Sequence, residues 1–145
     1  VTGLDLVAAQ IAIAAGEGLP LRQSALNARG WAIECRINAE DPDNDFMPSP
    51  GRVTAAHWPS GEGIRVDTHI EAGSFVPPYY DSLLGKVIAW GHDRDAALAR
   101  LRTALAMTRI EGVKTNVAYQ ASILADPEFA AGGVDTGFLA RFRRE

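Results

Sequence analysis

Apolar and polar residues alternate along several short stretches in the first two thirds of the chain. Within residues 31–38 every second position is apolar, and these positions are Trp31, Ile33, Cys35 and Ile37. This alternation predicts a half-buried strand, because successive side chains of a strand point to opposite faces. Further strands are predicted near 52–57, 64–70 and 84–90, separated by turns rich in glycine, proline and serine. Residues 41–51 contain three prolines and are predicted to form a loop.

Helical spacing of apolar residues dominates the two ends of the chain. Residues 2–16 carry an apolar run between Thr2, a predicted N-terminal cap, and Gly16, a typical helix stop. The clearest helix begins at Asp93. Its apolar stripe consists of Leu98, Leu101, Ala104 and Leu105, and Arg94, Arg100 and Arg102 lie largely off that stripe. The remaining predicted elements are an extended piece at 108–111 and helices near 116–124 and 137–143.

The order of these elements predicts the fold class. Strands come first and helices later, with connections of hairpin length between the strands, so we expect an α+β fold. The strands should form an antiparallel sheet with flanking helices. The chain has 145 residues, of which 47% are hydrophobic, and it can therefore bury one sizeable core. Residues 1–145 are predicted to form one domain.

Charge and cysteine content exclude several classes of protein. The formal net charge of -4 argues against a general nucleic-acid binder. No stretch is long and apolar enough to predict a membrane span. Cys35 is the single cysteine, which precludes an internal disulfide and fits a reducing compartment. Its place on the apolar side of a strand predicts a buried, unreactive thiol.

The strand predicted at 64–70 carries the most suggestive side chains. Its two faces consist of Ile64, Val66 and Thr68, interpreted as core, and of Arg65, Asp67 and His69 on the opposite side. A guanidinium suits flat anionic groups, because its fork of N–H donors can make two parallel bonds. From the pattern alone, the simpler interpretation is a solvated strand face with weak ion pairs.

Common catalytic motifs are missing from the sequence. The Gly-Glu-Gly pieces at 16–18 and 61–63 lack the remaining spacing of a phosphate-binding loop and its following lysine. His57, His69 and His92 lack the spacing of metal ligands, so no metal site is predicted. No Gly-x-Ser-x-Gly elbow occurs either.

Longer runs of sequence resemble one known family, in the same order along the chain. They are WAIECRINAEDP at 31–42, FMPSPG at 46–51, the stretch around Arg65, YYDS at 79–82 and IEGVKTN at 110–116. Together they resemble the C-terminal region of biotin carboxylases, the ATP-grasp subunits or domains of acetyl-CoA, propionyl-CoA and pyruvate carboxylases. The resemblance implies an antiparallel sheet with helices packed against it, docked on an ATP-grasp core. The helix within 1–16 is expected to pack toward that core.

The resemblance also implies a reaction. Biotin carboxylases use ATP and bicarbonate to form carboxyphosphate, and then carboxylate N1 of biotin on a carrier protein. By this resemblance Arg65 is the catalytic arginine that faces biotin and carboxyphosphate. ATP, bicarbonate and magnesium are bound mainly by the ATP-grasp domains that precede this region, so the chain alone is expected to be inactive.

The implied partners are the ATP-grasp N-terminal and central domains, a second copy in a homodimer, a biotin carboxyl carrier protein and a carboxyltransferase subunit. The implied location is the cytoplasm of a bacterium, or the mitochondrion if the source is a eukaryote, and fatty acid biosynthesis is the implied setting. Two other functions stay open: a non-catalytic dimerisation or docking module of a biotin-dependent carboxylase complex, and a fragment of a related urea carboxylase.

Several other side chains carry two interpretations each. Asp67 or His69 either orients Arg65 or pairs structurally with the neighbouring strand. Glu34 and Arg36 either line a face toward another domain or form a solvated strand face.

The segment after Pro77 and Pro78 is interpreted as a rigid corner. This corner holds Tyr79, Tyr80 and Asp81, with Asp81 as its capping residue. Lys86 is either a surface charge or a contact to another domain. Trp90 is either an anchor of the dimer or an ordinary core tryptophan.

Overall fold

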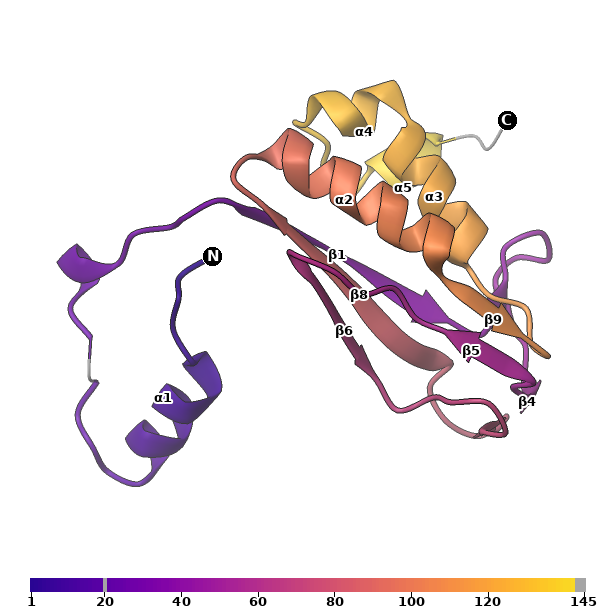
Figure 1. Cartoon of the computed structure of the whole chain (residues 1–145), viewed down its shortest axis with the longest axis horizontal. Coiled ribbons are helices and arrows are strands. Elements are labelled where there is room, and N and C mark those ends of the chain that lie inside the picture. The colour runs from indigo at the N-terminus through magenta and orange to yellow at the C-terminus, as the bar shows by residue number, and fades with distance from the viewer. Residues whose placement is uncertain (20, 143–145) are drawn as a thin grey trace.

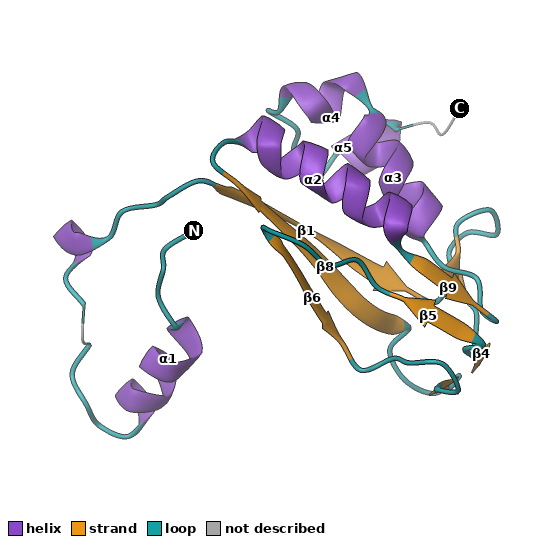
Figure 2. Cartoon of the chain, in the orientation of Figure 1, coloured by secondary structure: helices purple, strands orange, loops and turns teal. Residues whose placement is uncertain are grey.

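A computed structural model describes residues 1–19 and 21–142 of the chain. Its largest sheet has three antiparallel strands in the order β1, β8, β6. Their bounds are Trp31–Asn38 for β1, Ile64–Thr68 for β6 and Leu83–Gly91 for β8. The later helices gather on one face of this sheet (Figure 1 and Figure 2). The prediction of an α+β fold with an antiparallel sheet and flanking helices is therefore confirmed.

The helix-covered face of the sheet holds the main core. Val87 of β8 lies opposite Cys35 of β1 on one side and opposite Val66 of β6 on the other. These side chains pack against α2 (Arg94–Met107). The predicted stripe of α2 is buried there, namely Leu98, Leu101, Ala104 and Leu105. Trp31 was expected on the core side of β1 but is 52% exposed, because it stands at the end of the sheet opposite Gly91.

The polar side of α2 also holds the fold together. The helix begins as predicted, with Asp93 as the N-terminal cap that accepts a hydrogen bond from the N–H of Ala96 at 2.8 Å. Its arginines donate to backbone carbonyls of other segments: Arg94 Nη1 to Ala130 at 2.6 Å, Arg100 Nη1 to Trp90 at 2.7 Å and Arg102 Nε to Leu124 at 2.8 Å. These bonds tie the helix both to the sheet and to the helices that follow.

Three shorter helices complete the helical layer. They are α3 (Val117–Ala125), α4 (Pro127–Ala131) and α5 (Phe138–Arg141). α3 and α5 correspond to the helices predicted near 116–124 and 137–143, of which residue 143 lies outside the described residues. α4 was not predicted. It begins with Pro127 in its first turn, and Asp126 caps it by accepting hydrogen bonds from the N–H groups of Glu128 and Phe129.

Short two-stranded ladders extend beyond the main sheet. They pair β2 (Glu40–Asp41) with β3 (Met47–Pro48), β4 (Gly51–Arg52) with β7 (Phe75–Val76), and β5 (Ala55–His57) with β9 (Arg109–Glu111). β9 matches the extended piece predicted at 108–111. The strand predicted near 52–57 is instead split into β4 and β5, because two adjacent residues turn to different partners. The N–H of Val53 donates to the carbonyl of Ser74, and that of Thr54 donates to the carbonyl of Glu111.

Residues 1–19 and 21–30 form an arm that extends away from the sheet and its helices (Figure 1). The arm contains α1 (Leu6–Ala14) and a short 3-10 helix, η1 (Gln23–Ala25). The prediction that Thr2 caps the first helix is wrong, because Asp5 is the cap and accepts from the N–H of Ala8 at 2.9 Å. None of the residues of α1 is buried, and its exposed apolar side chains include Leu6, Val7, Ile11 and Ile13.

Cys35 should behave as an unreactive thiol. Its side chain is buried in β1, and desolvation, with a smaller effect of the Glu34 charge, raises the thiol pKa from 9.0 to about 12. Because the thiolate is the nucleophile, the reactive fraction near neutral pH should be about a thousandfold smaller than in the unfolded chain. We expect iodoacetamide to label Cys35 only after denaturation, as measured by mass spectrometry. Equal labelling rates in folded and urea-unfolded protein would contradict this.

The same shift predicts how stability depends on pH. The folded pKa of Cys35 lies above the unfolded value, so folding favours the protonated thiol. The free energy of unfolding should therefore be unaffected by this group below pH 9.0 and should fall as the pH rises toward about 12. A Cys35→Ala variant should lack this part of the alkaline loss in denaturant titrations.

Candidate functional site

Arg65 forms a fork-shaped ion pair with Asp67 on β6. The Nε and Nη2 atoms of Arg65 donate to Oδ1 and Oδ2 of Asp67, both at 2.8 Å. Both residues lie on the sheet face opposite α2, because the alternate residues Ile64 and Val66 pack into the core. The Arg65 side chain is 72% exposed and that of Asp67 is 42% exposed. The structure thus presents a guanidinium that is held along one edge and open to solvent.

Neighbouring strands extend this pair into a row of charges across the sheet. Asp67 lies opposite Lys86 in the register of β6 and β8. Lys86 Nζ in turn lies 3.7 Å from Oε1 of Glu34 on β1. The hydrogen bonds from Arg65, aided by the charges of Arg65 and Lys86, hold the pKa of Asp67 below its usual value. Arg65, Asp67, Lys86 and Glu34 thus form a charged row across three strands, in which the charged form of Asp67 is favoured.

His69 does not join the charged row. β6 ends at Thr68, whose hydroxyl donates to the carbonyl of Leu84 at 2.7 Å. The chain leaves the sheet at this point and His69 is exposed. Within the part of the chain that the structure describes, no hydrogen bond or ion pair joins His69 to Arg65 or Asp67. Of the two residues considered as possible partners that orient Arg65, Asp67 contacts it and His69 does not.

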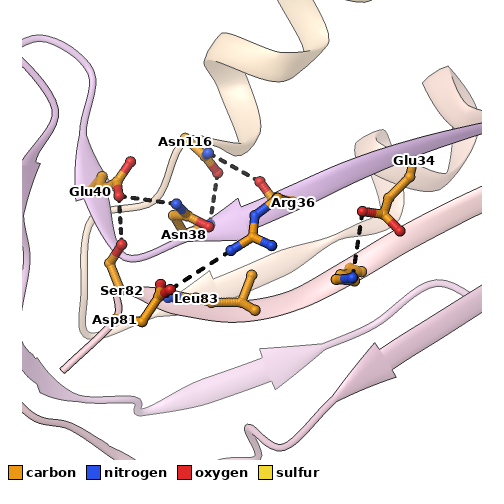
Figure 3. A network of polar contacts seen from close by, with 9 residues as sticks. Glu34, Arg36, Asn38, Glu40, Asp81, Ser82, Leu83 and Asn116 are labelled. Carbon is orange, nitrogen blue, oxygen red and sulfur yellow. Dashed lines mark hydrogen bonds and ion pairs between the residues drawn. The ribbon is translucent and has the colours of Figure 1, made fainter.

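The corner between β7 and β8 is built around Asp81. Its Oδ1 accepts a hydrogen bond from the N–H of Leu83 at 2.8 Å, and its Oδ2 lies 3.8 Å from Arg36 Nη2. The adjacent Ser82 hydroxyl donates to Oε1 of Glu40 at 2.5 Å (Figure 3). These contacts fit the interpretation of a rigid corner with a capping Asp. They also give Arg36 a structural partner within the chain.

Aromatic side chains near the two ends of β8 are exposed to solvent. Tyr79 and Tyr80, in the corner, are 88% and 82% exposed. Trp90, near the end of β8, is 38% exposed, and its Nε1 donates to the carbonyl of Arg29 at 3.0 Å. Its ring lies so close to Gly30 that a Cβ there would come within 2.6 Å of it. Trp90 therefore fastens the arm to the sheet and is not an ordinary core tryptophan, and its role as an anchor of the dimer stays a prediction.

The arm and Arg65 border a common open hollow. Residues 1–7 and Arg65 line a hollow of about 760 Å³. The arm closes on itself beside Trp90, because the N–H of Arg29 donates to the carbonyl of Val1 at 2.9 Å. The two ends of the arm are thus held together, and its first residues lie next to the guanidinium.

A second polar junction was missed by sequence reasoning. The side chain of Asn116 accepts a hydrogen bond from the N–H of Asn38 at 3.0 Å and donates to the carbonyl of Arg36 at 3.1 Å (Figure 3). Lys114 Nζ lies 2.5 Å from Oδ2 of Asp41, which lowers the pKa of Asp41 and raises that of Lys114. The runs at 31–42 and 110–116 therefore meet in space, and their polar residues fasten the end of β1.

Metal ligands are not gathered anywhere in residues 1–19 and 21–142. No three side chains of His, Cys, Asp or Glu lie close enough there to hold an ion. In the same residues, no helix has the length and hydropathy needed to cross a membrane.

Known proteins with similar sequences point to one family. A family model described as the biotin carboxylase C-terminal domain matches residues 34–141. The biotin carboxylase of Allochromatium vinosum is 52% identical over 141 residues, which make up 97% of this chain and 31% of that protein. The biotin carboxylase of a Nostoc species is 47% identical over 144 residues, which make up 99% of this chain and 32% of that protein.

Solved structures agree with the sequence matches. The biotin carboxylase subunit of a pyruvate carboxylase superposes on 97% of this chain with a TM-score of 0.93 and 44% identity. The biotin carboxylase domain dimer of Hydrogenobacter thermophilus 2-oxoglutarate carboxylase, solved with MgADP, ADP and bicarbonate, gives a TM-score of 0.92 and 43% identity over 97% of this chain. In both comparisons this chain spans 31% of the matched chain. By sequence and by fold, the chain belongs to the family of biotin carboxylase C-terminal domains.

Proposed function

We propose that the chain is the C-terminal domain of a biotin carboxylase that carboxylates N1 of carrier-bound biotin with ATP and bicarbonate. In this proposal Arg65 is the domain's catalytic residue. The observation that carries the proposal is the guanidinium of Arg65, held along one edge by Asp67 and exposed beside the hollow that residues 1–7 also line. The chain's membership in the family of biotin carboxylase C-terminal domains supports the same activity.

The proposed role of Arg65 follows from the movement of charge. Biotin supplies a ureido nitrogen that accepts the carboxyl group, and loss of the N1 proton shifts negative charge onto the ureido oxygen. A fixed guanidinium next to that oxygen stabilises the transition state more than the neutral ground state. The same donors can hold the oxygens of carboxyphosphate, since a guanidinium fork suits both carboxylate and phosphate.

The other reactants are assigned to the rest of the enzyme. The described residues present no cluster of carboxylates for magnesium, and no phosphate-binding loop occurs in the sequence. The chain spans 31% of a relative such as the Allochromatium vinosum enzyme, which leaves most of such a protein to bind ATP, bicarbonate and magnesium. No step of nucleotide chemistry is therefore assigned to this domain.

The exposed face of α1 supports a contact with those ATP-grasp domains. Its side chains Leu6, Val7 and Ile11 are all more than half exposed, although they are apolar. Contiguous apolar side chains of this kind are typical of an interface. The further partners that we propose are a second copy in a homodimer, a biotin carboxyl carrier protein and a carboxyltransferase subunit. The proposed location is the bacterial cytoplasm.

The chain alone is expected to be inactive. We expect no bicarbonate-dependent release of phosphate from ATP and no carboxylation of free biotin, because the chain has neither a phosphate-binding loop nor, within its described residues, a magnesium site. Both can be measured with the purified chain, next to a full-length biotin carboxylase that carries it as its C-terminal domain. The full-length protein should show both activities. Absence of biotin carboxylation in the full-length protein would refute the proposed function.

A further inference from the structure

The hydrogen bonds of Arg65 occupy one defined edge of its guanidinium. Nε and Nη2 carry the two N–H groups that point along the side of the group, and both of these bind the carboxylate of Asp67. A second pair of parallel N–H groups lies along the end of the guanidinium, one on Nη1 and one on Nη2. Within residues 1–19 and 21–142, no acceptor binds Nη1. The end edge is therefore the one available to a ligand.

Asp67 is itself held in place by its strand neighbours. It lies in the middle of the β6–β8 pairing, opposite Lys86, and the positive charge of Lys86 faces it from the adjacent strand. Lys86 is balanced in turn by Glu34 of β1. The carboxylate thus sits on a paired strand within a row of alternating charges. Such a support restricts a long arginine side chain that would otherwise sample many rotamers.

We propose that Asp67 is a positioning residue for biotin carboxylation. Its carboxylate binds the side edge of the Arg65 guanidinium, so that the end edge of the guanidinium is presented to the reacting oxygen. This inference rests on the proposed function and adds a second residue to it. The ligand that fits the end edge is an oxygen atom or a planar oxygen pair carrying negative charge, such as the ureido oxygen in the transition state. The gain comes from preorganisation, because the guanidinium is oriented before the substrate arrives.

A second ion pair in the chain offers a matched control. Arg109 and Glu111 lie two residues apart on β9 and also form an ion pair, in which Arg109 Nε donates to Glu111 Oε1 at 2.6 Å. Their side chains are 70% and 43% exposed, compared with 72% and 42% for Arg65 and Asp67. The two pairs therefore share strand spacing and solvent exposure, but only one of them borders the hollow lined by residues 1–7.

The test compares Asp67→Asn with Glu111→Gln in the full-length carboxylase. Asparagine keeps the size of Asp67 but removes the charge and one acceptor. The Arg65 guanidinium then loses one of its two hydrogen bonds and its ion pair, and its orientation is less restricted. We expect kcat for biotin carboxylation to fall about 10-fold, with little change in the KM for biotin, because the loss falls on the transition state. Glu111→Gln should leave both constants unchanged. Equal effects of the two substitutions, or a change confined to KM, would overturn the inference.

The double variant Arg65→Ala/Asp67→Asn separates positioning from an independent role. If Asp67 acts through Arg65, the double variant should be no slower than Arg65→Ala alone. Losses that multiply would overturn the inference, since Asp67 would then act by itself. If Arg65→Ala is slow while Asp67→Asn is as fast as the wild type, the inference fails and the proposed function stands. If Arg65→Ala is itself normal, the proposed role of Arg65 fails.

Stability is followed in parallel by thermal unfolding. If Asp67→Asn folds poorly, Asp67→Ser takes its place, because serine also keeps a polar side chain at this position. The same kcat for biotin carboxylation is then measured. A 10-fold fall in kcat in whichever variant remains folded supports the inference, and a normal kcat in that variant overturns it.

Discussion

Arg65→Ala should lower the rate of biotin carboxylation by about 10²- to 10³-fold in a full-length carboxylase that carries this domain. This is the usual loss when one preorganised donor to a developing negative charge is removed. Arg65→Lys should recover only part of the rate, because an ammonium keeps the charge but lacks the planar fork. Turnover of biotin, with ATP and bicarbonate saturating, is the measurement for both variants.

Two controls show whether the loss is specific. Arg109→Ala removes an arginine of similar exposure from the matched pair on β9 and should leave turnover unchanged. The midpoint of thermal unfolding should stay the same in Arg65→Ala, because Arg65 lies on the sheet face opposite the core. The KM for ATP should also stay the same, because ATP binding is assigned to the rest of the enzyme. Turnover that falls together with the unfolding temperature would make Arg65 a structural residue.

Asn116→Ala should destabilise the folded domain by about 2–4 kcal/mol. Asn116 is buried, and its side-chain amide bonds to the backbone of β1 as a neighbouring strand would. It accepts from the N–H of Asn38 and donates to the carbonyl of Arg36, both on the unpaired side of β1. Alanine leaves these backbone groups without this partner, and an unsatisfied buried group costs about 1–3 kcal/mol. The free energy of unfolding from urea titration measures the effect.

Gln120 provides the comparison for this junction. Its Nε2 reaches the same carbonyl of Arg36, but at 3.5 Å and from an exposed position. Gln120→Ala should therefore change the free energy of unfolding by less than about 0.5 kcal/mol. If both variants lose the same stability, the junction depends on helix α3 as a whole and the Asn116 amide has no special part in it.

Local patterns predicted the main elements well. Alternation placed β1, β6 and β8 and assigned Arg65 to the outer face, because the period of a strand follows from its own residues. The stripe of α2 and its cap at Asp93 were equally local. Partners distant in sequence could not be predicted in this way. The bonds from the arginines of α2 to later carbonyls, and those from Asn116 back to β1, join segments whose approach only the fold determines.

The candidate site could likewise be predicted only in part, where a local pattern or the family resemblance identified a residue. Its central side chain, Arg65, came from pattern and family resemblance, and the two-residue spacing already made Asp67 a possible partner. The exclusion of His69 depended on where β6 ends, and the structure places that end at Thr68. The bond from Trp90 to the carbonyl of Arg29 was missed for a similar reason, since the two residues lie far apart in the sequence. Side chains at strand ends thus need the tertiary structure before a role can be given.

The position of β8 in the sheet has a consequence for how the chain folds during synthesis. β8 is the central strand, yet it follows β1 and β6 in the chain. Once β6 has been synthesised and until β8 follows, β1 and β6 both lack their partner and expose hydrogen-bonding edges. Such edges are prone to pair with other chains. The sheet can close only after Gly91 has emerged, so folding should be slow for a domain of this size and the nascent chain should depend on chaperones until then.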